Sequence, residues 1–324
     1  MKDPLTLEQI KAEAQRLGFS ACGAAPAAPL AEWRIQQREQ WLRQGCHGEM
    51  DYLERNEEKR RDPRLLVEGA QTVVSLALNY CPSHEFPQGT YRLARYALGK
   101  DYHDVMKARL LALMTALGLT PNVDGRAFVD TAPVDEHYWA WRCGLGSLGR
   151  HTQLIIPHAG TYFFLGELVL TIPVEGYVEA PCYELPLGSF SKACLHCQRC
   201  VNACPTGALS LERGLDARLC LSYLTIEKRG DLPDGTGAKM GEVIYGCDRC
   251  TEVCPHNIQA VPTQIPEFQP SEALLAMKPE DWKHLSVEEY RKLFKGSAVK
   301  RAKYEGLMRN IEAVETVQQK ETED

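Results

Sequence analysis

The sequence predicts an α+β protein in three parts, and three observations lead to this prediction. Residues 1–178 alternate amphipathic helical patterns with short apolar runs that are typical of buried strands. Residues 179–265 lose this periodicity and gather cysteines. Residues 266–324 have helical patterns and end in a polar tail. We therefore expect an N-terminal α/β-type domain, a cysteine-rich domain and a short helical C-terminal segment.

The N-terminal part alternates helix and strand signals. Thr6-Leu7-Glu8-Gln9 has the spacing of a capping box, which predicts a helix that runs to about Leu17. The run 72–78 is apolar and partly β-branched, which favours a buried strand. In 102–117 the leucines and Met114 supply the apolar face of a helix. We also expect helices at 31–43 and 137–142, and strands at 19–24, 127–130, 153–156 and 162–170.

The cysteine runs carry the most specific chemistry. The first run is Cys194-x2-Cys197-x2-Cys200-x3-Cys204-Pro205, which is the bacterial ferredoxin spacing, in which the fourth cysteine ligates the other cluster. The second run, Cys247-x2-Cys250-x3-Cys254-Pro255, has Ile244 where its first cysteine is expected. Cys220 lies between the runs and is the natural substitute.

This spacing predicts two [4Fe–4S] clusters in a bacterial ferredoxin-like domain. The first cluster takes Cys194, Cys197, Cys200 and Cys254, and the second takes Cys204, Cys220, Cys247 and Cys250. Structural zinc is disfavoured because the x2, x2, x3 run is not a zinc-ribbon pattern. Two adjacent clusters imply electron transfer. We expect the other five cysteines to be small buried apolar residues: Cys22, Cys46, Cys81, Cys143 and Cys182.

Charge and hydropathy restrict the partners. The 324 residues carry a formal net charge of −6, which argues against a polyanion as partner. The stretch 291–310, however, has a single acid, Glu305, and these basic residues: Arg291, Lys292, Lys295, Lys300, Arg301, Lys303 and Arg309. On its own this stretch indicates a solvated helix face. No apolar run is long enough to span a bilayer and no secretory signal is apparent, so we expect a cytoplasmic protein without a membrane partner.

Two weaker motifs fail a closer test. Residues 144–149 satisfy G-x-G-x-x-G, but a helical pattern precedes them and a strand follows, which is the reverse of a dinucleotide site. A tight, flat backbone close to a large planar ligand fits this segment better. Asp101-Tyr102-His103 begins the D-x-H-x-x-G pattern of some corrinoid proteins, but Met106 replaces the glycine. We therefore expect His103 to be a structural helix residue and not a metal ligand.

Asp130 follows an apolar strand pattern directly before a turn. Such a carboxylate is suited to acid–base chemistry, although an Asx-turn cap would give the same pattern. Asp135, Glu136 and His137 follow closely and could also serve.

Taken together, these segments resemble the epoxyqueuosine reductases, cobalamin-dependent enzymes of the last step of queuosine synthesis in tRNA. The resemblance rests on residues 47–53, 95–103, 129–133, 144–146, 163–168, 245–248 and 296–301, with both cysteine runs. The chain departs from the family pattern at His137, where arginine is usual, and at Ser147, where an aromatic residue is usual. A helical-repeat extension that some members carry does not appear in it.

The resemblance implies a cobalamin between the N-terminal domain and the cluster domain, without a protein histidine on cobalt. It implies that Asp130 is the proton donor and that Arg60 contacts the cofactor. Other positions matched to the cofactor site are Leu154, Ile156, Leu165, Ser222, Tyr245, Cys247 and Asp248. It also turns the basic stretch into a tRNA surface, with Lys295, Lys300, Arg301 and Lys303 as candidates.

The resulting hypothesis is a monomeric oxidoreductase that deoxygenates epoxyqueuosine to queuosine at the wobble position of tRNA. Electrons come from an external low-potential donor through both clusters to cobalamin, and Asp130 supplies a proton. A carboxyl that donates a proton near pH 7 needs a partly desolvated site. The alternatives are a cobalamin-dependent reductase of a small molecule, similar to reductive dehalogenases, and a plain electron carrier.

Overall fold

A four-stranded sheet forms the centre of the N-terminal half in the computed structural model, which describes residues 4–83, 89–177 and 190–323, with side chains to Val317. The strand order is β2 (Ala21–Pro26), β3 (Thr72–Asn79), β8 (Phe163–Leu170) and β5 (Gly125–Phe128). All three neighbouring pairs are antiparallel. The protein is a mixed α+β structure, as expected, and the alternating helices and strands of its N-terminal half form an antiparallel sheet. Helices and strands alternate along the chain, but the order of strands in the sheet differs from their order in the chain, because β8 lies between β3 and β5.

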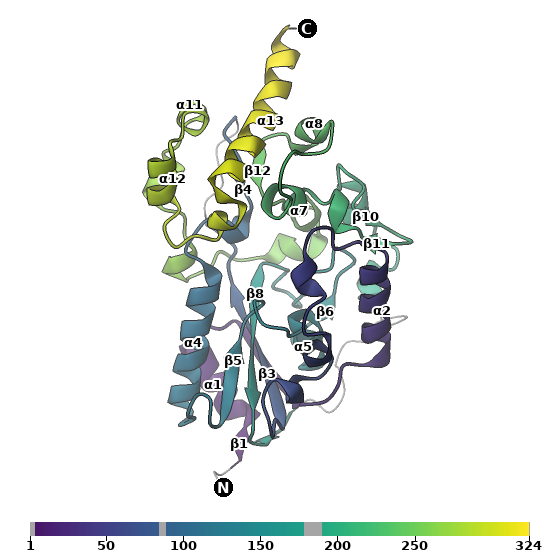
Figure 1. The fold of residues 1–324 in the computed structure, drawn as a ribbon. Helices are drawn as coiled ribbons and strands as arrows, with labels where there is room; N and C mark the ends of the chain where they lie inside the picture. Colours follow the sequence, from purple (N-terminus) through teal and green to yellow (C-terminus); the bar gives the residue numbers. More distant parts are fainter. Residues whose placement is uncertain (1–3, 84–88, 178–189, 324) are drawn as a thin grey trace.

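The two faces of this sheet are covered by different helices (Figure 1). Side chains alternate along a strand, so Leu76 and Leu168 face the helices α1 (Leu7–Arg16) and α4 (Tyr102–Ala116). Val73 and Val169 face the other way, toward α5 (Glu136–Arg142). Gly166 allows the close approach of α4, because a Cβ there would lie 2.9 Å from Met106 and Leu110.

Short elements surround this sheet. They are α2 (Glu32–Arg43), η1 (Asp51–Leu53), α3 (Glu57–Arg61), η2 (Pro63–Leu65) and η3 (Arg95–Ala97). Three small two-stranded pairs join β1 (Leu5–Thr6) to β9 (Val174–Glu175), β4 (Arg92–Leu93) to β12 (Val243–Tyr245), and β6 (Ser147–Leu148) to β7 (Leu154–Ile155).

The cysteine-rich segment consists of short helices and hairpins. Its elements are η5 (Lys192–Cys194), α6 (Arg199–Asn202), β10 (Leu209–Ser210), β11 (Gly214–Leu215), η6 (Ala217–Leu219), α7 (Leu221–Ile226), α8 (Thr236–Met240), α9 (Arg249–Glu252) and η7 (Pro255–Gln259). The C-terminal segment follows with η8 (Pro266–Phe268), α10 (Glu272–Leu275), α11 (Pro279–Lys283), α12 (Val287–Leu293), η9 (Ala298–Ala302) and α13 (Lys303–Glu323).

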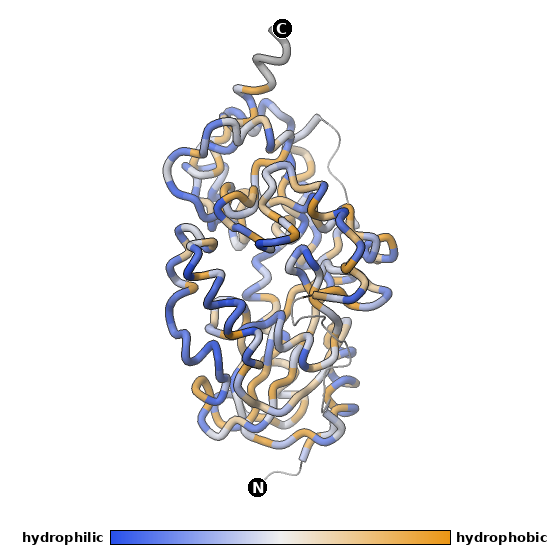
Figure 2. The backbone as a smooth tube through the Cα atoms, turned by 90° about the vertical axis from the view of Figure 1, so that its right-hand side faces the viewer, coloured by the Kyte–Doolittle hydropathy of each residue, from blue (hydrophilic) through white to orange (hydrophobic). Residues whose placement is uncertain are grey.

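A second core joins these last two segments. Leu221 and Ile244 from the cysteine-rich segment pack in one buried cluster with Trp282 and Leu307, and Leu93 joins them from the N-terminal half. The buried amide of Asn310 donates hydrogen bonds of 2.9 Å to the carbonyl oxygens of Thr225 and Ile244. Helix α13 therefore closes the core beside the cysteine loops. Figure 2 shows hydrophilic stretches along one side of the lower half and hydrophobic stretches through its middle.

Many local predictions are confirmed. Thr6 caps α1, and its hydroxyl accepts a hydrogen bond of 3.2 Å from the backbone N–H of Gln9. The expected helices and strands of the N-terminal half are present, with ends that shift by one to a few residues. The proline-rich stretch near residue 265 packs on the N-terminal half, because Ile265 and Phe268 belong to the same buried cluster as the apolar face of α4. The three-part division at 178/179 and 265/266 stays a prediction.

No helix in the described ranges is both long enough and apolar enough to cross a membrane.

Candidate active site

A cavity of about 450 Å³ lies where the edge of the sheet meets the cysteine-rich segment. Strands β3 and β5 end at this edge, and β8 begins there. The N-terminal half contributes Tyr80, Tyr96, Tyr102, Asp130, Glu136, His137, His151, Phe163, Phe164 and Leu165 to its wall. The cysteine-rich segment contributes Cys204, Cys220, Ser222, Cys247, Asp248, Arg249, Cys250 and Thr251.

Aromatic rings line the sheet side of the cavity. Tyr102 stacks on Phe164 with ring centroids 4.3 Å apart and planes 3° apart. Phe164 also contacts Tyr80 at 4.4 Å and Phe268 at 4.9 Å. This wall fits an extended planar ligand, because such rings offer apolar faces and lose little side-chain freedom.

Asp130 lies on this wall, two residues after β5, where it meets the N-terminus of α4. Its Oδ2 accepts a short hydrogen bond from the Tyr102 hydroxyl. Its Oδ1 lies 2.6 Å from Nε2 of His103. The other ring nitrogen of His103, Nδ1, lies 2.6 Å from Oδ1 of Asp101. Both oxygens of Asp130 are therefore in contact with neighbouring side chains, while 34% of the side chain stays exposed.

The charge of His103 follows from its two carboxylate neighbours. Burial alone would lower the pKa of this imidazole, but Asp101 and Asp130 outweigh it and raise that pKa to about 10. Burial, followed by the charge of Asp130, raises the pKa of the Tyr102 hydroxyl. At neutral pH the site therefore holds an imidazolium and a neutral phenol against Asp130.

The other acids near Asp130 differ sharply in their surroundings. Arg34 binds both oxygens of Asp135 at 2.7 and 2.9 Å, so the pKa of Asp135 is lowered in spite of its burial. This carboxylate is a poor proton donor. Glu136 lines the cavity, and burial together with Asp130 and Glu167 raises its pKa well above the usual value. Burial also lowers the pKa of His137.

Glu167 is a further acid that sequence reasoning missed. It is fully buried on β8, where the Ser75 hydroxyl donates to its Oε1 at 3.2 Å and Oε2 has no hydrogen-bond partner. Burial raises its pKa to about 8. A lone carboxyl in the apolar run 163–170 was the available signal. Sequence reasoning also missed the contacts of Tyr102 and His103 with Asp130, which join segments far apart in the chain.

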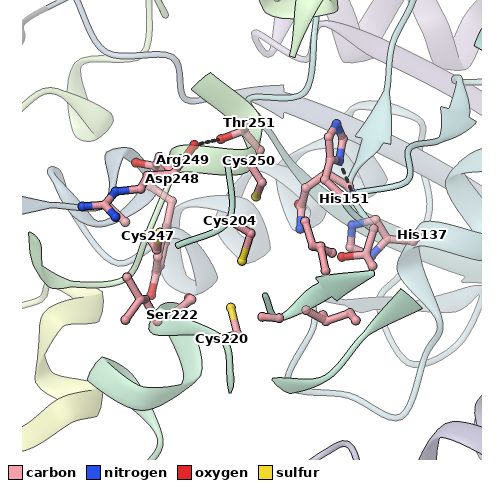
Figure 3. A pocket seen from close by; sticks show the side chains of 18 of the residues that line it. His137, His151, Cys204, Cys220, Ser222, Cys247, Asp248, Arg249, Cys250 and Thr251 are labelled. Carbon is pink, nitrogen blue, oxygen red and sulfur yellow. Dashed lines mark hydrogen bonds between the residues drawn. The ribbon is translucent and has the colours of Figure 1, made fainter. Parts of the chain in front are cut away.

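The eight cysteines form two neighbouring groups. Those that line the cavity are Cys204, Cys220, Cys247 and Cys250, and Figure 3 shows their thiols around a common space, with His137 and His151 on its other side. Burial raises the pKa of the Cys250 thiol, and Cys247 and Cys220 raise it further. Cys200, which belongs to the other group, also raises the pKa of the Cys250 thiol.

The second group lies away from the cavity. Burial raises the pKa of the Cys254 thiol, and nearby Cys194 and Cys197 raise it further. Among the residues that the structure describes, no three His, Cys, Asp or Glu side chains converge as a single metal ion would require. In a [4Fe–4S] cluster each thiolate binds a different iron, so its ligands stand around a larger space.

The remaining cysteines lie outside both groups. Cys46, Cys81 and Cys143 are buried, as expected, whereas Cys22 is only half-buried. Cys182 falls outside the described residues.

The positions matched to the cofactor site separate into two sets. Leu165, Ser222, Cys247 and Asp248 line the cavity together with Asp130. Burial raises the pKa of Asp248 to about 6, although its carboxylate accepts a hydrogen bond of 2.7 Å from the Arg95 backbone. The side chains of Leu154 and Ile156 instead pack in the core beside α5.

Two more of these positions lie behind the cavity wall. Tyr245 is fully buried, and its hydroxyl donates to the Ala298 carbonyl at 2.7 Å. Arg60 lies on α3, and its pKa is lowered by burial and by Arg38 while Glu136 opposes this effect. Its Nε is buried without a hydrogen-bond partner. For Leu154, Ile156, Tyr245 and Arg60 a role toward the cofactor stays a prediction.

The glycine motif has a structural explanation. A Cβ on Gly146 would lie 2.1 Å from the carbonyl oxygen of Ile155, which pairs across the β6–β7 hairpin. Gly144 follows the end of α5 and has φ +82°, a left-handed conformation that favours glycine. Thr152 and Gln153, and not these glycines, reach the cavity.

The basic residues near the C-terminus have different environments. Lys295, Lys300 and Lys303 are exposed. Arg301 makes two hydrogen bonds of 2.8 Å to Glu227 and lies over the ring of Tyr52. Arg309 donates to the carbonyl oxygens of Leu224, Lys228 and Gly230, so it has a structural role.

Two family models match separate parts of the chain. Residues 60–131 match the family model described as epoxyqueuosine reductase QueG, DUF1730. Residues 193–257 match the model of a 4Fe–4S double cluster binding domain. The second match confirms that the cysteine-rich segment is a two-cluster domain.

Curated relatives match over nearly the whole chain. The epoxyqueuosine reductase of Cellulophaga algicola is 40% identical over 304 residues, which cover 94% of this chain and 96% of that protein. The one from Pseudomonas aeruginosa is 38% identical, with 95% and 85% covered, and that of Escherichia coli is 35% identical, with 96% and 82% covered.

Solved structures agree with this. An epoxyqueuosine reductase crystallised with an epoxyqueuosine-modified tRNA-Tyr stem loop has a TM-score of 0.82 and 28% identity, covering 95% of this chain and 80% of that one. The Bacillus subtilis enzyme, with its catalytic aspartate loop swung out of the active site, has a TM-score of 0.81, 28% identity and the same coverage. The present chain belongs to the epoxyqueuosine reductase family.

Proposed function

We propose that this protein reduces epoxyqueuosine to queuosine at the wobble position of tRNA. The observation that carries the proposal is the arrangement of one cavity. It has a hydrogen-bonded carboxyl, Asp130, on one wall and four cysteines of a two-cluster domain on another. A reductive elimination of oxygen requires both an electron source and a proton source at one place.

The resident groups that we propose are two [4Fe–4S] clusters and a cobalamin, which supply single electrons and a strongly reducing cobalt centre when bound. The cysteines fit the clusters because they form two groups of four thiols. Cys194, Cys197, Cys200 and Cys254 would hold one cluster. Cys204, Cys220, Cys247 and Cys250 would hold the other, beside the cavity.

The cavity also fits a corrin ring. Its walls carry the stacked rings of Tyr102 and Phe164 and the apolar Leu165, together with polar groups on Ser222 and Asp248. A large planar cofactor needs mostly apolar faces and few orienting polar contacts. His103 is engaged with two carboxylates, which supports cofactor binding without this histidine on cobalt.

Asp130 has the position of a proton donor. Two-thirds of its side chain is covered, and it lines the cavity beside Tyr102. Conversion of an epoxide to an alkene releases the oxygen as water, so a proton must reach that oxygen as its bonds to carbon break. The Tyr102 hydroxyl holds the carboxyl in place for this transfer.

The substrate class follows from the family and from surface charge. A related enzyme has been crystallised with a tRNA stem loop. The exposed Lys295, Lys300 and Lys303 supply cations for tRNA phosphates although the whole chain is acidic. The modified base has to leave its stack to enter the cavity, as single-stranded loop bases readily do.

The decisive experiment is turnover by the anaerobic, reconstituted protein with added cobalamin, a low-potential electron donor and epoxyqueuosine-containing tRNA. Queuosine should form in the tRNA, and free epoxyqueuosine nucleoside should be a poor substrate. Asp130→Asn keeps the shape of the side chain but offers no acidic proton. We expect kcat to fall by about 10²–10⁴-fold with iron and corrinoid contents unchanged.

Asp104→Asn is the matched control, because Asp104 is exposed on the same helix as Tyr102. It should behave as wild type. A fully loaded wild-type protein that leaves the tRNA unchanged would contradict the proposed function. Full activity of Asp130→Asn would contradict only the role of Asp130.

A further inference from the structure

The proposed reaction needs more protons than Asp130 holds. Conversion of an epoxide to an alkene and water consumes two electrons and two protons. The external low-potential donor supplies the electrons one at a time. A single carboxyl supplies one proton and is then a carboxylate. The second proton must therefore reach the same place from another group or from solvent.

We propose that His103 supplies this second proton through Asp130, and that Asp101 positions His103 for the transfer. The inference rests on the proposed function. Asp130 first protonates the departing oxygen as one carbon–oxygen bond breaks. As the second carbon–oxygen bond breaks, the departing hydroxyl group takes a proton from Asp130 while Asp130 takes the proton from Nε2 of His103, so both transfers occur in one step. Water leaves, and His103 recovers a proton from solvent.

The contacts form a continuous path. Nε2 of His103 lies 2.6 Å from Oδ1 of Asp130, the distance of a charge-assisted hydrogen bond. The N–H is not well aligned, since Oδ1 has no hydrogen bond of good geometry. Catalytic hydrogen bonds are often poorly aligned before substrate binds and improve in the complex. The His103 side chain is 30% exposed, which gives it access to solvent protons.

Asp101 has the features of a positioning residue. It is the N-cap of α4, where its Oδ1 accepts a hydrogen bond of 3.1 Å from the backbone N–H of His103. The same oxygen lies 2.6 Å from Nδ1 of the ring. This contact places a proton on Nδ1 and directs Nε2 toward Asp130. Stacking of the ring on Tyr102, with centroids 4.1 Å apart, fixes its plane.

The charges around the pair support proton storage on His103. Asp101 and Asp130 face the imidazole and raise its pKa to about 10 in spite of burial. Asp130 also faces the Tyr102 hydroxyl, and it acts electrostatically on Glu136, Glu167 and Tyr52. Asp130 also acts electrostatically on His137, which lies on α5. Glu136 is the other candidate donor, but the close contact with Asp130 belongs to His103.

The test compares His103→Ala and His103→Gln in the loaded enzyme. Both should lower kcat by about 10²-fold with KM changed by less than about twofold, because neither carries a mobile proton. Added imidazole should restore His103→Ala by about tenfold or more, since the missing side chain leaves room for it, and should leave His103→Gln unchanged. His284→Ala, at an exposed histidine after α11, is the matched control.

A readout that does not depend on activity is the reaction of His103 with diethyl pyrocarbonate, which modifies neutral imidazole only. Peptide mass spectrometry should find His103 protected at neutral pH in wild type and modified faster in Asp101→Asn. The same variant should move the basic limb of the kcat profile to lower pH, because the pKa of His103 falls toward its ordinary value of 6.5.

The outcomes separate the possibilities. Wild-type kcat in His103→Ala overturns the relay and leaves the proposed function intact. If His103→Ala loses activity that imidazole does not restore, while His103→Gln keeps the wild-type kcat, then His103 has only a positioning role. That result also overturns the relay. If His103→Ala does not accumulate as folded protein, the Asp101→Asn profile decides, and an unchanged basic limb overturns the proposal. Absence of turnover in wild type refutes the proposed function itself.

Discussion

At the scale of single residues, Glu167 is the clearest conflict between side chain and surroundings. It carries a carboxyl in the middle of a strand whose neighbours are apolar, and one of its oxygens has no hydrogen-bond partner. The pKa of about 8 means that the native protein keeps this group neutral at physiological pH. Because protonated Glu167 is uncharged, it adds no negative charge near Asp130 and Glu136.

This residue predicts a specific dependence of stability on pH. The unfolded chain ionises Glu167 near pH 4.5, whereas the native state keeps the proton up to about pH 8. Stability from this group is therefore complete below pH 4.5 and is lost as pH rises through about 8, by at most about 1.4 kcal/mol per pH unit. Glu167→Gln should flatten the fall of the apparent melting temperature between these values.

Differential scanning fluorimetry of the loaded protein measures this effect. Glu175→Gln, at an exposed glutamate on β9, is the control and should keep the wild-type slope. Parallel pH profiles for wild type and Glu167→Gln would show that Glu167 is already ionised in the native state.

At the scale of elements, the cysteine loops depend on exchange between the two runs. Cys254 is the last cysteine of the second run and the N-cap of η7, yet its thiol neighbours belong to the first run. Cys220 is the N-cap of α7 and comes from neither run. Short helices α6 and α9 pack against each other between these positions. The cluster away from the cavity would therefore hold two chain segments together, and the cluster beside the cavity would hold three.

Iron content tests the two ligand sets. Cys220→Ala should lose the cluster beside the cavity, and Cys194→Ala should lose the other, each leaving about four of about eight irons per protein. Corrinoid reduction should fail in both variants. Cys22→Ala, on β2 and outside both groups, should keep all the iron. Electron paramagnetic resonance of the reduced variants would reveal a wrong assignment if Cys220→Ala retained both cluster signals.

At the scale of the whole molecule, the local charge differs from the total. The net charge of −6 would repel tRNA, but Lys295, Lys300 and Lys303 are exposed in one short stretch beside η9. Arg301 and Arg309 are held by protein partners, so the candidate tRNA surface is narrower than the sequence implies. A test that reverses Arg301 would disturb its Glu227 and Tyr52 contacts as well.

Salt dependence separates a tRNA surface from a solvated one. Lys295→Glu with Lys300→Glu should weaken tRNA binding and reduce the slope of log affinity against log salt by roughly 0.7–0.9 for each phosphate that the variant no longer neutralises. Lys11→Glu with Lys107→Glu changes the charge equally on α1 and α4 and should leave the slope unchanged. Equal slopes in fluorescence anisotropy titrations of both double variants would refute a role for Lys295 and Lys300.

Features that depend on neighbouring residues could be predicted from the sequence. The capping box at Thr6, the helix that ends near Leu117 and the strand at 72–78 follow from local patterns, and all are present. The cysteine spacing likewise predicted a two-cluster domain. Asp130 could be chosen because it follows a strand, and its motif belongs to a known family.

Features that depend on distant pairing could not. The alternating patterns indicated helices and strands but not the strand directions, which depend on which strands become neighbours, and β8 pairs with both β3 and β5. The contacts of Asp130 with Tyr102 and His103 need the end of one strand to meet the start of a helix. Gln153 reaches the cavity, whereas Leu154 and Ile156 pack in the core. A shift of one residue along this segment therefore decides which side chains reach the cavity.

The bonds of Asn310 have a consequence for the order in which the protein matures. This amide joins the carbonyl oxygens of Thr225 and Ile244, which belong to the segments that carry Cys220 and lead to Cys247. During translation, Asn310 follows Thr225 by 85 residues and Ile244 by 66 residues. The nascent chain thus presents the cysteines of the inner cluster before the support behind them exists. The core behind these cysteines can therefore close only after α13 has been made.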